Sequence, residues 1–361
     1  MNNKRDAYID VVKGITIISI VIGHASWDLK FPFGVTIEIG KFVYLYHIST
    51  FLFCSGYLYN NEKNDLWSYV SRRFQSIYMP YLVYIWFYYL FRNILIHLGV
   101  IEGQPYGIIN SILYFSNAVC LVGEGELLSA FWFIPMMFFN ISIFAVIICL
   151  SSKIDNRIFK ILMRVITICA IGLVGIISVE NGLGILYNLQ ISYLLLPVTA
   201  LGFCARKIDI KKYCNTIGIV ISVAIMIYII EKDYGYIELS RNMIINRRLF
   251  YPVTCISIFF VLCLAKQIMK IEMLKNGLSI VGRYSYDIMA MHFLAIKLVD
   301  IIVCHMIGRH DLLSNFPHSF ENIWLVYYIV GVVLPIIIRI LFNKVLSWIK
   351  KQSCFIWKGS A

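Results

Sequence analysis

Apolar runs of about 20 residues recur along the whole chain and constrain its fold more than any other feature. A helical run of this length crosses the roughly 30 Å of membrane hydrocarbon, where only helices and closed barrels satisfy their own backbone hydrogen bonds. Hydrophobic residues make up 60% of the chain and charged residues only 14%, which excludes an ordinary soluble domain. We predict an all-α, polytopic membrane helix bundle of about ten transmembrane helices, over residues 8–27, 41–59, 77–97, 130–150, 161–179, 185–205, 214–231, 248–265, 284–304 and 321–343.

The loops between these runs differ in their content of lysine and arginine. With a cytoplasmic N-terminus, most of these residues fall in loops on the cytoplasmic side, among them Lys4, Arg5, Lys63, Arg72 and Arg73. Cytoplasmic loops usually carry such an excess, so we predict that both termini are cytoplasmic. The same bias explains the net charge of +12 without a nucleic acid partner.

The chain shows no soluble domain, long linker or low-complexity segment. We therefore expect one integral-membrane domain over residues 1–350 and a short cytoplasmic tail over residues 351–361. The first apolar run lacks a small-residue cleavage site, so we expect it to remain in the mature protein. The ten cysteines form no C-x-x-C pair and lie mostly in apolar runs, which predicts neither a metal site nor a disulfide.

Lys13 and His24 stand eleven residues apart in the first apolar run. Over eleven residues a helix makes three full turns and about 20° more, so both side chains face the same neighbour or cavity, about 16 Å apart along the axis. Charged and titratable groups inside a bilayer are costly and usually functional. The pair fits a long anionic ligand bound end-on, although a snorkelling lysine and a histidine bonded to another helix fit it too.

Later runs hold further candidate residues. His47 is expected at a depth similar to that of His24, which indicates either a polar site or a mutual structural hydrogen bond. Arg72 and Arg73 precede the third run, where an arginine pair is usually a topology anchor but also suits phosphate oxygens. His292 lies within the ninth run, about nine residues from its inner end.

Two segments on the predicted outer side interrupt the up-and-down pattern. Residues 101–129 contain an apolar run too short to span, followed by the acidic residues Glu124 and Glu126. Residues 231–248 form the most charged outer loop. Either segment could shape a pocket for a polar acceptor, and a plain solvated loop fits each one as well.

Several short motifs follow one another along nearly the whole chain, namely Tyr8-Ile9-Asp10, Lys13-Gly14 and Gly23-His24, His47 with Ser55-Gly56-Tyr57, Arg72-Arg73 with Pro80-Tyr81, Trp132-Phe133, Gly202-Phe203, and Gly282 with Tyr284-Ser285 and His292. In this order they resemble the acyltransferase-3 superfamily of integral-membrane acyltransferases, closest to its branch of fucose 4-O-acetylase-like and surface-polysaccharide O-acetyltransferases. At one position the chain departs from the family, because Ser76 stands where a second arginine often follows three residues after Arg73.

The resemblance implies an enzyme of the bacterial inner membrane that takes an acetyl group from cytoplasmic acetyl-CoA. The acceptor would be a sugar hydroxyl of a cell-surface polysaccharide, such as capsule or O-antigen, or of its lipid-linked precursor. Its partners would be acetyl-CoA, the glycan and membrane lipid. The expected site residues are His24 as general base with His47 as second catalytic group, Lys13, Arg72 and Arg73 for the phosphates of coenzyme A, and His292, Glu124 and Glu126 for the acceptor.

Two alternatives stay open at this stage. Direct transfer assisted by His24 competes with a covalent acyl-enzyme on a serine or on the histidine itself. A transporter or flippase for a glycan or lipid-linked intermediate would also place basic and histidine side chains inside a bundle. Internal repeats, which many transporters show, are not evident in this chain.

Overall fold

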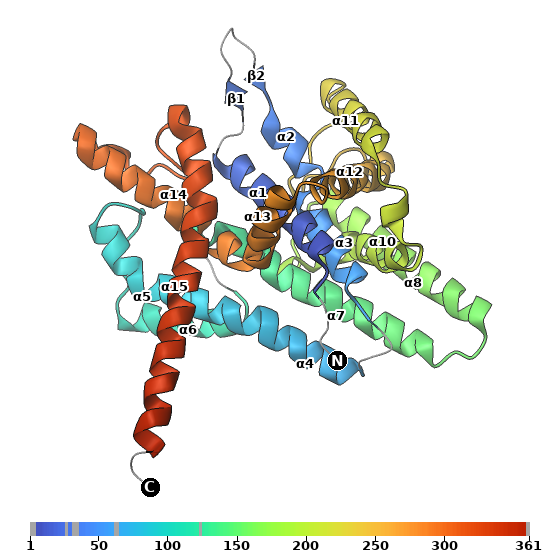
Figure 1. Ribbon diagram of the computed structural model, residues 1–361, viewed down its shortest axis with the longest axis horizontal. Helices are drawn as coiled ribbons and strands as arrows, with labels where there is room; N and C mark the ends of the chain where they lie inside the picture. Colours follow the sequence, from blue (N-terminus) through green and yellow to red (C-terminus); the bar gives the residue numbers. More distant parts are fainter. Residues whose placement is uncertain (1–4, 26–27, 31–35, 61–64, 123–124, 359–361) are drawn as a thin grey trace.

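The computed structural model describes residues 5–25, 28–30, 36–60, 65–122 and 125–358, and this part of the chain is almost entirely helical (Figure 1). One pair of strands occurs in it, β1 (Leu29–Lys30) and β2 (Thr36–Ile37), antiparallel with Leu29 opposite Ile37. The predicted all-α class is confirmed.

The helices follow one another along the chain with few long connections. A π-helical turn, Phe74–Tyr78, joins α4 to α5, and a 3₁₀ helix, Glu126–Trp132, leads into α7. The α-helices are α1 (Ala7–Ala25), α2 (Ile39–Tyr44), α3 (His47–Tyr57), α4 (Leu66–Arg73), α5 (Met79–His97), α6 (Ile108–Val119), α7 (Phe133–Ser152), α8 (Arg157–Glu180), α9 (Leu189–Leu194), α10 (Leu196–Lys207), α11 (Thr216–Glu231), α12 (Arg247–Ile268), α13 (Glu272–Arg283), α14 (Ser285–Ile307) and α15 (Trp324–Lys358).

Local sequence explains where several helices begin. The side-chain oxygens of Asn156 and Asn215 accept backbone hydrogen bonds at the starts of α8 and α11. Pro80 and Pro197 lie in the first turns of α5 and α10, where the missing N–H of proline costs nothing. These residues end one apolar segment and start the next, which keeps the connections short.

Among the described residues, six helical segments are long and apolar enough to cross a membrane, so the chain is a multi-pass membrane protein. They are Ala7–Ala25, Glu126–Ser152, Arg157–Glu180, Arg247–Ile268, Ser285–Ile307 and Glu321–Trp348.

The other four predicted spans coincide with helices that are broken, bent or shorter. α9 and α10 are bent by 50° and make a seventh span if they cross together, and α11 has only 16 residues. The run 41–59 is divided into α2 and α3, and the run 77–97 begins in the π-helical turn before α5. The count of ten spans and the cytoplasmic termini stay predictions. Residues 351–358 of the predicted tail continue α15 as helix.

α1 lies at the centre of the bundle and packs against α2, α3, α12, α13, α14 and α15. Most of its residues are buried, as expected for a helix that is apolar on all sides. Where α1 crosses α13, a Cβ at Gly14 would lie 2.3 Å from the carbonyl oxygen of Leu278. A Cβ at Gly282 would lie 1.8 Å from the carbonyl oxygen of Asp10. The two backbones therefore approach so closely that only glycine fits on either side.

α3 and α10 cross in the same way. A Cβ at Gly56 would lie 1.8 Å from the carbonyl oxygen of Thr199, and a Cβ at Gly202 would lie 2.0 Å from that of Phe53. Glycine-mediated crossings of this kind bring membrane helices together without large side chains. The glycines of four motifs found in the sequence thus have a packing role beside any chemistry of their neighbours.

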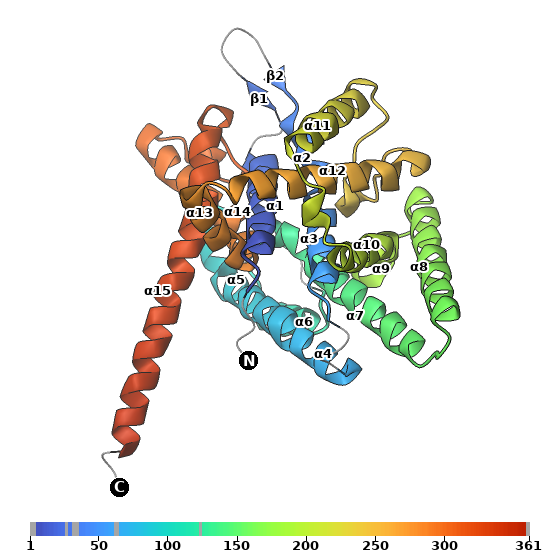
Figure 2. The same ribbon diagram turned by 45° about the vertical axis from the view of Figure 1, so that its right-hand side comes forward.

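The two ends of the bundle differ. α4 lies at the end that holds the N-terminus, whereas the β1–β2 hairpin lies at the opposite end (Figure 1, Figure 2). α15 extends past the other helices at its C-terminal end, in both views. Lys13 lies near the middle of α1 and His24 next to its last residue, so the two are about 16 Å apart along the helix axis.

Candidate active site

A cavity of about 800 Å³ lies at the end of α1 that carries His24. This volume is in the range of cavities that hold small molecules. Elements far apart in the sequence form its wall: α1, α2, α3, the start of α7, α14, and the loops before α12 and after α14. The lining residues are Ile20, His24, Lys41, Tyr44, His47, Ile48, Phe51, Ser129, Ala130, Trp132, Phe133, Tyr236, Glu238, Leu239, Ser240, Arg241, Met289, Phe293, Phe316 and Pro317.

His24 lies against a second histidine from α14. The rings of His24 and His292 are stacked, with centres 5.3 Å apart and planes 23° apart. The ring of Phe293 lies 4.9 Å from that of His24 and 4.1 Å from that of His292. His292 is fully buried, so the structure brings it to His24 itself and does not place it on the cavity wall, where acceptor contact was predicted.

Backbone carbonyl groups determine which nitrogen of two histidines carries a proton. His292 Nδ1 lies 3.1 Å from the Ile288 oxygen and 2.9 Å from the Met289 oxygen, and His47 Nδ1 lies 3.0 Å from the Val43 oxygen. A carbonyl oxygen only accepts, so Nδ1 donates in both residues and Nε2 of the neutral ring keeps a free lone pair. Nε2 of His292 is buried and has no hydrogen-bond partner.

His47 lines the same cavity as His24, and Tyr44 lies between them. The ring of Tyr44 is 4.5 Å from that of His47 and 6.5 Å from that of His24. α1 and α3 therefore place two imidazoles on the wall of one cavity.

Charged side chains face one another where α2 and the loop before α12 form the cavity wall. Lys41 Nζ lies 2.8 Å from a Glu38 carboxylate oxygen, and Arg241 Nε lies 3.2 Å from one of Glu238. Tyr236 adds a hydroxyl group to the same wall. Both segments expected to shape a pocket contribute, because residues 236–241 and 129–130 line it.

Arg72 and Arg73 line a different pocket, of about 470 Å³. They form the last turn of α4, which begins where the Asp65 carboxylate accepts a hydrogen bond of 2.6 Å from the backbone N–H of Ser68. That bond lowers the pKa of Asp65 and holds the carboxylate as the helix N-cap. The guanidinium of Arg73 lies 5.1 Å from the centre of the Tyr69 ring. The other lining residues are Leu58, Asn60, Gln75 and Ser76.

Lys13 does not line this second pocket. Its partly buried side chain interacts electrostatically with Arg73 and with Cys54 of α3. The nearby Asp10 carboxylate is paired with Arg5, at 2.7 Å. Arg72 and Arg73 thus line the pocket at the end of α4, with Lys13 within electrostatic range of Arg73, whereas His24 and His47 line the larger cavity.

Glu126 lies elsewhere. It lines a smaller cavity of about 240 Å³ with Tyr88, Arg92 and Tyr106, where the Arg92 guanidinium lies 3.6 Å from the Tyr106 ring centre. The structure therefore does not bring Glu126 to the wall of the histidine cavity, and its predicted contact with the acceptor stays a prediction. Glu124 lies outside the described residues.

Several lining residues were missed by sequence reasoning. Lys41 is a charged residue at the start of an apolar run, and Tyr44 lies three residues before His47, so both carried a usable signal. Phe293 and Phe316 carried none, because aromatic residues are common throughout this chain. Their place at the cavity follows only from the packing of α14 and the loop after it.

Comparison with known proteins identifies the family of the chain. A family model, acyltransferase-3, described as an acyltransferase domain, matches residues 6–344. Comparison with curated proteins and with solved structures gave no match. The matched range includes α1 to α14 and most of α15, and with them both the histidine cavity and the arginine pocket. This chain belongs to the acyltransferase-3 family of membrane acyltransferases.

Proposed function

We propose that this protein moves an acetyl group from cytoplasmic acetyl-CoA to a sugar hydroxyl of a cell-surface polysaccharide or its lipid-linked precursor, in the bacterial inner membrane. The observation that carries the proposal is the pairing of sites along α1. A pocket lined by Arg72 and Arg73 lies within electrostatic range of Lys13, and a cavity with two imidazoles on its wall lies at the His24 end. Coenzyme A has phosphates at one end and a thioester at the other, and so matches this polarity.

The cationic end suits the phosphates. Lys13 and Arg73 lie within range of mutual repulsion, which an anionic ligand relieves. Arginine binds phosphate oxygens with paired N–H groups, whereas lysine contributes a point charge. Arg72 and Arg73 at the end of α4 and Lys13 on α1 would hold phosphates from two sides. The pantetheine arm would then extend along α1 for the roughly 16 Å to His24.

His24 is the proposed general base. Its imidazole takes the proton of the acceptor hydroxyl while the hydroxyl oxygen attacks the thioester carbonyl carbon. The carbon–sulfur bond breaks, the coenzyme A thiolate leaves, and the imidazolium returns the proton to it. Base assistance of this kind contributes about 10²- to 10⁴-fold to the rate. The products are the acetylated sugar and free coenzyme A.

The neighbouring groups have distinct proposed roles. His47 is the second catalytic group, because its Nε2 lone pair belongs to a cavity-lining ring and can accept a hydrogen bond from the acceptor. His292 supports the His24 ring by stacking. The paired charges of Lys41, Glu238 and Arg241 present both donors and acceptors, as hydroxyl-rich ligands require.

The test is acetyl-CoA consumption by the purified protein in detergent, measured as free thiol release with and without methyl hexosides as acceptors. We expect His24→Ala to abolish thiol release while acetyl-CoA binding, measured by calorimetry, persists. Lys13→Ala should raise the KM for acetyl-CoA about tenfold, the loss expected for one charge-assisted contact.

His305→Ala is the matched control, since this exposed histidine lies in the last turn of α14, far along the helix from His292. It should leave turnover unchanged. A folded wild-type protein that binds no acetyl-CoA would overturn the acyltransferase proposal for this substrate and favour transport of a glycan or lipid-linked intermediate. A stable acetylated protein, detected by mass spectrometry during turnover, would replace direct transfer by the covalent route.

A further inference from the structure

Lys297 and Asp300 are two charged residues in the middle of α14 whose side chains are completely buried. Neither lines the histidine cavity. Lys297 Nζ lies 3.4 Å from Asp300 Oδ2 and donates a hydrogen bond of 2.8 Å to the Leu313 carbonyl oxygen. It also donates to the carbonyl oxygen of Asn315. The ammonium group therefore has three partners, two of which belong to the loop between α14 and α15.

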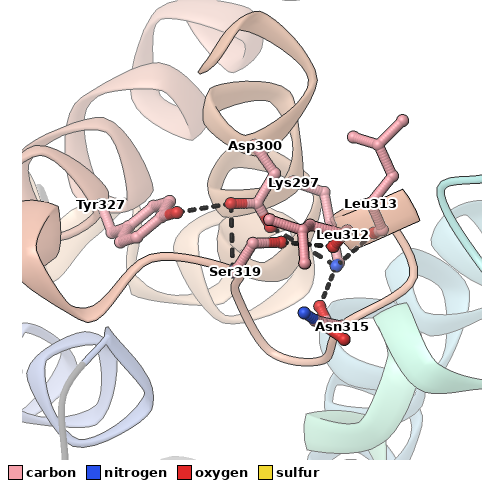
Figure 3. Close-up of polar contacts among 7 residues, drawn as sticks. All are labelled: Lys297, Asp300, Leu312, Leu313, Asn315, Ser319 and Tyr327. Carbon is pink, nitrogen blue, oxygen red and sulfur yellow. Dashed lines mark hydrogen bonds and ion pairs between the residues drawn. The ribbon is translucent and has the colours of Figure 1, made fainter. Parts of the chain in front are cut away.

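Asp300 binds the same loop from its other carboxylate oxygen. Oδ1 accepts a hydrogen bond of 3.2 Å from the backbone N–H of Ser319 and another from the hydroxyl of Tyr327 on α15. The Ser319 hydroxyl in turn donates to the Leu312 carbonyl oxygen, at 2.5 Å. Figure 3 shows these contacts converging on one turn of α14. We call Lys297, Asp300, Ser319 and Tyr327 the Lys297–Asp300 network.

The network holds the loop on both sides of two residues that line the histidine cavity. Lys297 binds the carbonyl oxygen of Asn315, and Asp300 binds the N–H of Ser319. Between these positions lie Phe316 and Pro317, which form part of the cavity wall.

Phe316 connects this wall to the reacting histidine. Its ring lies 4.9 Å from that of Phe293, and the ring of Phe293 lies 4.9 Å from that of His24. A shift of the loop at Phe316 would therefore move the Phe293 ring, and with it the space beside His24.

A buried ion pair is an expensive way to hold a loop. Removing two charges from water costs several kcal/mol per ion, and well-packed apolar residues often hold a structure as firmly. Directional bonds to backbone groups, in contrast, define one position of the loop rather than a range of positions. The network thus contributes geometry at the cavity wall more than it contributes stability.

We propose that Lys297 and Asp300 are positioning residues that hold Phe316 and Pro317 against the cavity beside His24, and so determine how tightly the sugar acceptor binds. The proposal rests on the proposed function, because it assigns this wall to the acceptor and not to acetyl-CoA. It predicts that loosening the loop raises the KM for the acceptor while the KM for acetyl-CoA stays the same.

The test uses two variants of the full-length protein in detergent. Lys297→Met/Asp300→Leu removes both charges together, which avoids leaving one ion buried without its partner. Phe316→Ala removes the wall ring and leaves the network intact. Hydrogen exchange of peptides covering residues 309–320, read by mass spectrometry, reports the loop. Thiol release with methyl hexosides reports the KM of acceptor and donor separately.

We expect the double variant to exchange at least about tenfold faster over residues 309–320, with α1 unchanged, since the N–H of Ser319 loses its partner. Both variants should raise the acceptor KM about tenfold, which is the factor that corresponds to one lost contact. The KM for acetyl-CoA should stay within about twofold. Asp311→Asn is the matched control, because it breaks an exposed ion pair with Arg309 in the same loop. It should change none of these quantities.

Three other results would each contradict a different part of the proposal. Unchanged exchange in the double variant would show that the network does not hold the loop. Equal changes in the KM of donor and acceptor, or an acceptor KM unchanged in Phe316→Ala, would overturn the assignment of the wall to the acceptor. A folded wild-type protein that consumes no acetyl-CoA would overturn the proposed function, and the exchange result would then still decide whether the network holds the loop.

Discussion

α14 carries buried polar groups at two places within nine residues, His292 and the pair Lys297 and Asp300, and they differ in how well their polar atoms are partnered. Lys297 and Asp300 have hydrogen-bond or ionic partners for the ammonium and for both carboxylate oxygens. His292, in contrast, keeps Nε2 buried with no partner and stacks on His24. Both places lie on one helix with apolar neighbours in the sequence, so the neighbouring residues in the sequence do not explain why one has partners and the other has none.

Buried polar groups are thus of two kinds, those whose atoms all have hydrogen-bond or ionic partners and those with an atom that has none. A fully partnered cluster resists the loss of any one member, because the remaining charge would be left in a dry interior. A buried nitrogen without a partner has lost its contact with water and gains no hydrogen bond in return, so it does not stabilise the fold. We expect changes at Lys297 or Tyr327 to act on loop geometry and, where they leave a buried charge without its partner, on stability. Changes at His24 or His292 should act mainly on turnover.

The largest expected effect is on the histidine side. His24→Gln keeps a polar side chain of similar length but removes the base, so turnover should fall by about 10²- to 10⁴-fold. The free energy of unfolding should change little, because His24 is only partly buried. Thiol release and SDS titration in mixed micelles measure the two quantities. A variant that unfolds more readily and keeps its turnover would reverse the comparison.

Lys297→Met tests the partnered side. The substitution leaves the Asp300 carboxylate buried without its ion pair, which costs about 3–5 kcal/mol of stability. The same SDS titration should show this loss. The double variant with Asp300→Leu should recover most of it, since the uncompensated charge is then gone. Equal stability of the single and double variants would mean that the pair is not coupled.

Tyr327→Phe removes one donor from Asp300 and leaves the others. A hydrogen bond to a charged group contributes about 1.5–3 kcal/mol, so the loss should be smaller than for Lys297→Met. The prediction is specific to this hydroxyl, and Tyr328→Phe, one residue along α15, is the matched control. If both variants lose the same stability, the hydrogen bond from Tyr327 to Asp300 contributes no more to the free energy of unfolding than the Tyr328 hydroxyl does.

His292→Phe separates stacking from the unpartnered nitrogen. The phenyl ring can still stack on His24, but it has no nitrogen lone pair. We expect turnover to fall by about tenfold, while stability stays within about 1 kcal/mol of the wild type, because no satisfied side-chain contact to another element is lost. Full turnover in this variant would limit the role of His292 to packing.

The smallest expected effect is a pH dependence of stability caused by His318, in the loop beside the Lys297–Asp300 network. His318 stacks on Tyr327, at 4.9 Å, and faces Asp300, Glu321 and Lys297. Burial lowers the pKa of His318, so the folded state favours the neutral ring. The stability that this provides is present above the ordinary histidine pKa of about 6.5 and is lost as the pH falls from there through the folded-state pKa. The unfolding midpoint should therefore drop between about pH 7 and pH 5.

His318→Phe should remove part of this pH dependence, because the ring that must be protonated is gone and the stacking on Tyr327 is kept. Midpoints measured at the two pH values for the variant and the wild type check it. An identical slope in both proteins would assign the pH dependence to other groups.

The periodicity and composition of the sequence predicted much of the fold. The ten apolar runs coincide with helices, and the glycines of the sequence motifs lie where α1 meets α13 and where α3 meets α10. Long apolar runs are reliable signals because the membrane leaves the backbone few other choices. The bend between α9 and α10 and the break between α2 and α3 were not visible in the same pattern, since apolar residues continue across both.

Only part of the candidate site could be predicted from the sequence. Lys13 and His24 lie on one helix and therefore follow from helical geometry alone. Glu126, chosen only because a carboxylate lay beside an expected pocket, lines another cavity. Lys297 and Asp300 were not singled out, although a charged pair three residues apart in an apolar run is unusual.

The sequence by itself determined a membrane helix bundle of an acyltransferase family and the alignment of Lys13 with His24, because both follow from spacing within a single helix or from ordered motifs. Only the tertiary structure decided that His292 stacks on His24 and that Lys297 and Asp300 hold the loop that carries Phe316. These contacts join residues far apart in the chain. Their geometry depends on how helices and loops pack, which no local pattern of residues specifies.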